Sequence, residues 1–259
     1  MRMNMRTLVL AAALIAGPQA ASALQLSELG LSPEQIKALL AQAKAPVASP
    51  GIAFGSPVAF GAGWGEVGVG AGGSTRPKGR SPTLDGGASV VVGVGNPKSA
   101  VGLESAVNII SIGEDPGHDG NVNLKLHTSL SRFSAMAVGV ENVARWGTAK
   151  KTRTSTFVAY SQLVPLPWNG PRALAFNIGL GDNRFSKGGE GTQLFGGMAV
   201  FVHPQVSLIA DYNGIELNGG VSWVPFRRWP LTINLGAINL TENTAGTEFS
   251  GGVGYSFRF

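Results

Sequence analysis

The sequence predicts an all-β fold: a transmembrane, antiparallel, up-and-down β-barrel of about twelve strands, preceded by a short N-terminal amphipathic helix. Three observations predict this class. Segments that alternate apolar and polar residues recur from Val58 to the C-terminus. Charged residues make up only 14% of the chain, against about 25% in globular proteins, and no segment after the N-terminal leader has the long apolar run of a membrane helix. Glycine is abundant, with 38 residues, and suits tightly coiled strands.

The N-terminal leader, residues 1–23, is predicted to be a secretory signal peptide. Residues 1–6 carry two arginines, residues 7–17 are apolar, and residues 21–23 form a small-x-small cleavage site. The apolar run is shorter than the roughly 18 residues that span a bilayer, so we expect cleavage after Ala23 rather than anchoring. The chain has no Cys, so neither a lipid anchor on Cys nor a disulfide is expected.

Residues 24–57 are expected to form a periplasmic or plug-like helix and a linker. Ser32 can cap a helix that starts at Pro33, and Gln35 completes a capping box. One face of this helix is apolar, with Ile36, Leu39, Leu40 and Ala43. Residues 45–57 are rich in Pro, Ser, Gly and Ala and are interpreted as the linker. The helix plugs the lumen, lies in the periplasm or merely packs at the barrel rim, and its terminal position favours the rim.

The barrel is expected to occupy residues 58–259. The clearest strand is the last, in which Phe249 to Phe259 carry the apolar face at alternate positions, while Ser256 and Arg258 lie on the polar face. The same alternation predicts strands at residues 58–73, 86–95, 100–113, 121–130, 134–144, 154–164, 172–181, 193–202, 206–213, 216–224, 229–240 and 248–259.

Short and long connections alternate between these strands. Short turns are expected at 96–99, 131–133, 203–205 and 225–228, and long polar loops at 74–85, 114–120, 145–153, 182–192 and 241–247. Two connections break the rule, because 165–171 is long on the short side and 214–215 is short on the long side. Outer-membrane barrels place short turns in the periplasm and long loops outside, which puts both termini on the periplasmic side.

The alternative fold is a soluble β-sandwich, whose outward face would be charged. Here the polar face consists mostly of Gly, Ser, Asn and Thr. Aromatic residues also collect near strand ends, as the interfacial girdle of a membrane barrel requires: Trp223, Phe226, Trp229, Tyr255, Phe257 and Phe259. These two features favour the membrane barrel.

The last strand, FSGGVGYSFRF over residues 249–259, resembles the C-terminal strand of Gram-negative outer-membrane β-barrel proteins. The resemblance implies that Tyr255, Phe257 and Phe259 form the signal read by the barrel-assembly machinery, and that the protein resides in the cell outer membrane. Residues 207–214 and 218–223 faintly resemble YjbH-type barrels, which are linked to exopolysaccharide.

Strand parity places ten polar residues on the lumen side, and we interpret them as candidates for lining a pore: Glu104, Asn108, Lys125, His127, Glu141, Asn177, Asp211, Asn218, Asn234 and Arg258. About twelve strands enclose more space than the eight whose side chains fill the interior. A passive channel for small polar solutes is therefore the first hypothesis. The alternatives are a narrow or plugged barrel with a structural or surface-polysaccharide-related role, and an outer-membrane lipid-acting enzyme.

The enzyme hypothesis rests on His127 and Ser129, whose spacing resembles that of outer-membrane phospholipases. Leu126 and Leu130 stand where that family has Asn and Gly, and no residue can be identified that would orient the base. We therefore assign no catalytic residue. His118 lies near Asp115 and Asp119 in a loop and is interpreted as solvated, so neither a metal nor a cofactor is expected.

The predicted outer loops are basic, with Arg76, Lys78, Arg80, Lys150, Lys151, Arg153, Arg184 and Lys187. These residues either contact phosphates of lipopolysaccharide in the outer membrane or form a solvated surface. The bases are dispersed, so nucleic-acid binding is not expected despite a net charge of +5. The sequence leaves the oligomeric state open.

Overall fold

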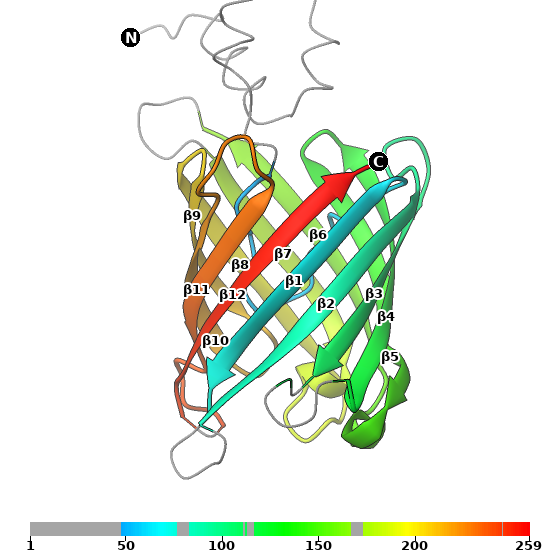
Figure 1. The fold of residues 1–259 in the computed structure, drawn as a ribbon, viewed down its shortest axis with the longest axis vertical. Coiled ribbons are helices and arrows are strands. Elements are labelled where there is room, and N and C mark those ends of the chain that lie inside the picture. The colour runs from blue at the N-terminus through cyan, green and yellow to red at the C-terminus, as the bar shows by residue number, and fades with distance from the viewer. Residues whose placement is uncertain (1–47, 77–82, 111, 113–116, 167–172, 245) are drawn as a thin grey trace, which may run out of the picture.

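The computed structural model describes residues 48–76, 83–110, 112, 117–166, 173–244 and 246–259. Within these residues, twelve antiparallel strands close into a single barrel (Figure 1). Each strand pairs with its neighbours in sequence, and β1 pairs with β12 to close the wall. The predicted up-and-down barrel is confirmed. Closure leaves no free strand edge, so the backbone groups of the wall are paired all the way around.

The strands are β1 (Glu66–Thr75), β2 (Leu84–Gly95), β3 (Gly102–Ile110), β4 (Asp119–Ser131), β5 (Ser134–Trp146), β6 (Ser155–Pro165), β7 (Ala173–Asp182), β8 (Thr192–His203), β9 (Val206–Tyr212), β10 (Leu217–Trp223), β11 (Leu231–Ile238) and β12 (Glu248–Arg258). In the described part of the chain, the 3-10 helices η2 (Gly147–Lys151) and η3 (Asn183–Phe185) lie in loops. The described residues contain no helix that is both long and apolar enough to cross a membrane.

The predicted spans of β2 to β12 agree with the structure to within three residues at each end. The prediction for the first strand is wrong, because β1 starts at Glu66 rather than at residue 58. Residues 58–65 alternate large and small side chains as a strand does, but the Ala59 and Ala62 N–H groups donate to side chains of distant strands and the Gly63 N–H donates to the nearby Glu66. The predicted signal peptide and N-terminal helix lie outside the described residues.

The two ends of the barrel differ in their connections. At one end, called the turn end, only residues 132–133 separate β4 from β5, and only residues 204–205 separate β8 from β9. The C-terminus lies at this end, which is uppermost in Figure 1. The opposite end, called the loop end, carries η2, η3 and most of the longer connections. This matches the alternation expected from the sequence.

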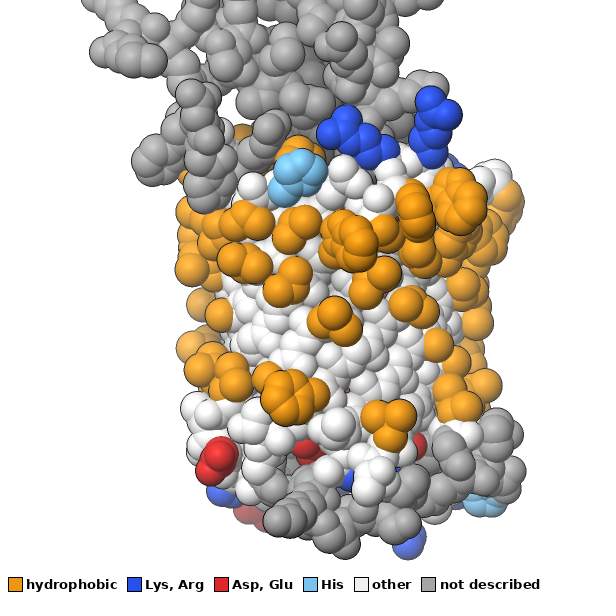
Figure 2. Space-filling view, turned by 60° about the vertical axis from the view of Figure 1, so that its left-hand side comes forward, with side chains coloured by type: hydrophobic (Ala, Val, Ile, Leu, Met, Phe, Trp, Pro, Cys, Tyr) orange, Lys and Arg blue, Asp and Glu red, His pale blue; other side chains and the backbone are white. Residues whose placement is uncertain are grey.

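The outer face of the wall is apolar and the inner face is small or polar. In β12, Phe249 is 70% and Val253 50% exposed, and apolar side chains project from the other strands in the same way. Figure 2 shows these side chains spread over the wall, with charged side chains at the two ends. On the inner face of the wall, Ser207 of β9 and Ser222 of β10 are buried. The predicted two-residue alternation of faces is therefore confirmed in β12 and β9.

Candidate functional site: a divided lumen

Residues 48–65, called the inner segment, run inside the barrel as a U-shaped strap. The segment starts at the turn end, where the Gly51 N–H donates to Ser222 Oγ at 2.7 Å and Ser207 Oγ donates to the Gly51 carbonyl at 2.6 Å. It returns to the same end, where the Trp64 N–H donates to the Gly95 carbonyl at 2.7 Å. In Figure 1 the segment is the blue trace visible between the strands. Part of the predicted linker thus lies in the lumen.

The descending limb of the strap is held by Asp211 of β9. This carboxylate is 1% exposed. It accepts hydrogen bonds from the N–H groups of Phe54 at 3.1 Å, Gly55 at 3.0 Å and Ser56 at 2.7 Å. A buried carboxylate is costly unless donors surround it, and three converging backbone N–H groups provide that environment. Asp211 therefore anchors this limb through three hydrogen bonds.

The middle of the strap is held by β6 and β7. Asn177 Nδ2 donates to Ser56 Oγ at 3.2 Å and to the Pro57 carbonyl at 2.6 Å. Ser161 Oγ donates to Asn177 Oδ1 at 2.7 Å and accepts from the Ala59 N–H at 2.9 Å. The two side chains form one buried network, so polar groups of the wall replace the ladder partners that this backbone lacks.

The ascending limb is held by an ion pair between β3 and β4. Lys125 Nζ lies 2.8 Å from Glu104 Oε1 and donates to the Phe60 carbonyl at 2.9 Å. Glu104 Oε2 accepts from the Ala62 N–H at 2.8 Å. Each charge is compensated by the other and by the strap, so neither is free to act on a solute in the lumen.

His127 lies inside the barrel and belongs to the same network. Its side chain is buried, and Nε2 lies 3.0 Å from the Ala62 carbonyl, to which it can donate. Ser129 has the same inward parity on β4. A lipid hydrolase would need this pair on the outer face, so the geometry does not support the enzyme hypothesis.

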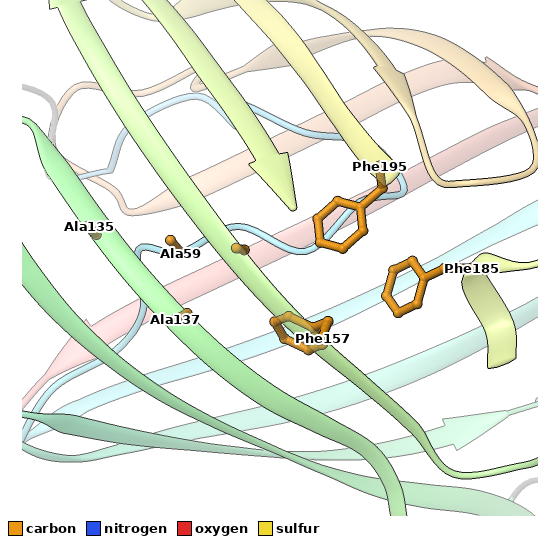
Figure 3. Packing of buried hydrophobic residues seen from close by; sticks show 7 residues of the cluster. Ala59, Ala135, Ala137, Phe157, Phe185 and Phe195 are labelled. Atoms are coloured by element: carbon orange, nitrogen blue, oxygen red, sulfur yellow. The ribbon is translucent and has the colours of Figure 1, made fainter. Parts of the chain in front are cut away.

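An aromatic cluster fills the lumen beside the strap. The Phe185 and Phe195 rings stack with centroids 4.8 Å apart, and Phe157 meets both edge-on at 6.2 and 6.4 Å. Figure 3 shows the three rings, from β6, η3 and β8, turned toward one another. Arg184 covers the Phe185 ring at 4.1 Å and pairs with Glu141. The cluster was not predicted, although the inward parity of Phe157 was a usable signal.

A cavity of about 820 Å³ remains on the opposite side of the lumen. Its wall is formed by β11, β12, β1 and β2, together with part of β3, and the inner segment contributes Ala53 and Phe54. The lining follows β1 from Gly68 to Ser74, which is most of that strand. The cavity therefore extends along most of the wall between the turn end and the loop end.

The structure places the ten predicted lumen residues in three groups. Glu104, Lys125, His127, Asn177 and Asp211 contact the inner segment. Asn108 and Asn234 line the cavity. The other three bond to the wall, since Asn218 accepts from the Asn239 N–H, Glu141 pairs with Arg184 and Arg258 lies 3.5 Å from Glu66. Sequence reasoning missed the buried serines that hold the strap, Ser161, Ser207 and Ser222, because an inward Ser is common in any barrel wall.

Tyr255, Phe257 and Phe259 are exposed and belong to the last residues of the chain, where β12 reaches the turn end. Their proposed role as an assembly signal stays a prediction. In the part of the chain that the structure describes, no three His, Asp or Glu residues come close enough to hold a metal ion. His118 Nδ1 lies 2.9 Å from Asp119 Oδ1, and Asp115 lies outside the described residues.

Most of the described basic loop residues bond to the chain itself. Arg76 pairs with Asp85 and Arg184 with Glu141. Arg153 donates to the Gly189 carbonyl and Lys187 to the Asn243 carbonyl. Lys150 and Lys151 of η2 are exposed at the loop end, while Lys78 and Arg80 lie outside the described residues.

No family model and no curated protein matches the chain. Solved structures do match, among them the crystal structure of the outer membrane protein Omp33 from Acinetobacter baumannii. The two are 11% identical in sequence and superpose with a TM-score of 0.41, over 75% of this chain and 98% of that one. The fold assignment rests on the closed strand order described above.

Proposed function

We propose that the protein is an outer-membrane β-barrel and a passive channel for small polar solutes, and that solutes pass through the half of the lumen that the inner segment leaves free. The observation that carries the proposal is the cavity along β1, which continues past the inner segment toward both ends of the wall. Two further features support it, the apolar outer belt and the anchoring of the strap.

The outer belt supports the membrane location. Large apolar side chains such as Leu235, Ile178 and Val138 are exposed all around the wall, whereas charged groups gather at the ends (Figure 2). In water such a surface would be far larger than the apolar patches of soluble monomers. In a bilayer the same surface meets acyl chains, and the closed strand ladder pairs the backbone groups of the wall, apart from local register shifts between β4 and β5 and between β8 and β9.

The strap supports a restricted path rather than a wide pore. Hydrogen bonds from β3, β4, β6, β7, β9 and β10 hold it against one side of the wall. The opposite wall of β12, β1 and β2 carries mainly glycine and serine on its inner face, so the free space lies there. A bore of this kind passes small solutes and excludes large ones.

The test is conductance of the purified protein in planar bilayers, combined with a variant that narrows the cavity. Gly254→Trp adds a large side chain on the inner face of β12, where the nearest atom to a new Cβ is the Val69 carbonyl oxygen at 3.9 Å. Ala71→Trp adds the same side chain to the outer face of the adjacent strand. We expect conductance to fall in Gly254→Trp and to stay unchanged in Ala71→Trp. Equal conductance in all three proteins would contradict the proposed path.

The inner segment also favours a second candidate, a plugged barrel with a structural or surface-polysaccharide-related role. A strap tied to β2 by the Trp64 N–H and to six further strands by side chains stiffens the wall and narrows the lumen. A folded, heat-resistant protein that shows no conductance, even after the strap is loosened by substitution of Asp211, would favour this candidate over the channel.

We propose two partners besides membrane lipid. The exposed aromatic end of β12 suits recognition by the barrel-assembly machinery, and deletion of Phe259 is expected to reduce assembly far more than export. Lys150 and Lys151 are placed to contact lipopolysaccharide phosphates at the loop end. Replacing both with Gln should weaken binding of lipopolysaccharide to the detergent-solubilised protein, while unchanged binding would exclude that contact.

A further inference from the structure

We infer that the open half of the lumen, called the glycine-lined half, is a path for neutral, hydroxyl-rich solutes such as small sugars, and that it does not distinguish cations from anions. The inference rests on the proposed channel function and adds the substrate class. It comes from the way in which charged groups are distributed between the two halves of the lumen.

Away from the ends of the barrel, the charged residues that face the lumen are compensated in the half that holds the inner segment, whereas Glu66, Arg258 and Glu248 of β1 and β12 lie at the strand ends. Glu104 and Lys125 pair at 2.8 Å, and Glu141 pairs with Arg184. Asp211 is surrounded by three backbone N–H groups of the strap. None of these five residues lines the cavity. Their fields are therefore largely cancelled before they reach a solute on the other side of the strap.

The glycine-lined half has an almost uncharged wall. Its polar side chains are hydroxyls and amides, namely Ser89, Asn108, Thr232, Asn234, Ser250 and Ser256. Among the described residues that line the cavity, Asp85 is the charged one; it lies at the loop end and pairs with Arg76. A ring of uncompensated charge, which gives other channels their ion selectivity, is thus missing from the described lining.

Hydroxyl and amide groups both donate and accept hydrogen bonds, so they can replace water around a neutral hydroxyl-bearing solute. An ion that enters the same space loses part of its hydration and meets no opposite charge, which raises its energy in the path. Phe54 adds an apolar surface from the inner segment, against which the C–H face of a sugar ring can lie. The combination of a few polar groups with an aromatic surface is typical of sites for small neutral ligands.

The first experiment compares solutes of nearly equal size in proteoliposomes that contain the full-length protein. Glucose, glucuronate and glucosamine differ mainly in charge. We expect glucose to enter about tenfold faster than either charged sugar, because a charge without a partner is penalised in a narrow uncharged path. We also expect the reversal potential in a KCl gradient to lie near zero.

The second experiment places a charge in the path. Gly254→Asp introduces a carboxylate on the inner face of β12, and Gly254→Asn introduces a neutral side chain of the same size. Gly68→Asp does the same on β1, where a new Cβ would have Val91 Cβ at 3.8 Å as its nearest neighbour. We expect both Asp variants to become cation-selective and to slow glucuronate further, and Gly254→Asn to keep the selectivity of the parent.

Different results distinguish a failure of the uncharged path from a failure of the channel function on which it rests. Strong charge selectivity in the parent, left unchanged by both Asp variants, would overturn the uncharged path while leaving a channel in place. Charged sugars that enter as fast as glucose would overturn it as well. If no solute enters and no conductance is measured, the channel itself is wrong.

Discussion

The two halves of the lumen use the same residue, glycine, in opposite ways. On the side of β5 to β8, Gly139, Gly179 and Gly181 lie directly beneath the rings of Phe157, Phe195 and Phe185, and a Cβ at any of them would overlap a ring. On the side of β12 and β1, a Cβ at Gly68 or Gly254 would meet no atom closer than 3.8 Å. In the first half these glycines make room for a neighbouring side chain, and in the second Gly68 and Gly254 leave room for a solute.

The difference shows that strand number alone does not set the bore of a barrel. Twelve strands would enclose a wide lumen, but a strap and three phenylalanine rings occupy one side of it. The side that holds the strap and the rings, called the filled half, therefore has a packed core like that of a soluble protein, while the glycine-lined half has none. The changes in unfolding free energy that substitutions cause should therefore differ between the two halves in magnitude and even in sign.

The largest effect is expected for Phe195→Ala in the filled half. Phe195 is 1% exposed and stacks on Phe185, and removal of a buried phenylalanine ring costs about 3–5 kcal/mol of unfolding free energy. The matched control is Phe176→Ala on the outer face of β7, where the ring is 42% exposed. Urea unfolding in lipid vesicles measures both. Equal losses would mean that the cluster is not a packed core.

The next effect tests which face meets the membrane. Val253→Arg places a charge on the outer face of β12 and should destabilise the barrel by about 2–4 kcal/mol at the bilayer midplane. Gly254→Arg places the same side chain in the glycine-lined half, and we expect little loss of stability. Vesicle unfolding of both variants checks this. A loss of stability in Gly254→Arg alone would mean that the faces of β12 are inverted. No loss of stability in either variant would mean that the segment does not face a membrane.

Asp211→Ala is expected to lower stability less than the two preceding substitutions, but to change transport more than it changes stability. Three N–H groups of the inner segment lose their acceptor, and unsatisfied buried donors cost about 1–3 kcal/mol each unless water reaches them. Because water can reach a strap that lifts from the wall, we expect a net loss near the lower figure and a rise in single-channel conductance. Asp211→Asn keeps one acceptor oxygen and should give an intermediate conductance. A conductance that does not change in Asp211→Ala would show that the strap stays in place without this carboxylate.

The smallest expected change in unfolding free energy is that of a Gly→Ala substitution, and its sign is opposite in the two halves. Gly68→Ala places a methyl group 3.8 Å from Val91 Cβ, an ordinary van der Waals distance, and reduces the freedom of the unfolded chain, so we expect a gain of about 0.4–1 kcal/mol. Gly179→Ala puts the same methyl group into the Phe195 ring and should be destabilising. Chemical unfolding of the two variants side by side measures the difference. A loss of stability in Gly68→Ala would show that the space beside β1 is not free.

Much of the barrel was predictable because the information is local. In β12, two-residue alternation from Phe249 onward assigns each side chain to lipid or lumen, and a slip by one residue would exchange both faces. The polar residues Glu104, Asn177 and Asp211 were placed on the lumen side by the same rule. Their contacts were not predictable, since the inner segment that they hold is far from Asn177 and Asp211 in sequence, as the bond between the Ser56 N–H and Asp211 shows.

Local patterns in the sequence were enough to predict the class of fold, a count of about twelve strands, the faces of the strands and the alternation of short and long connections. All of these follow from periodicity, composition and turn residues within a few positions of one another. The three-dimensional arrangement was needed to show that residues 48–65 fold back into the barrel and that the remaining space lies along β12, β1 and β2. The physical reason is that an extended backbone can satisfy its hydrogen bonds either in a ladder or on side chains of a surrounding wall, and the choice depends on residues that come together only when the barrel closes.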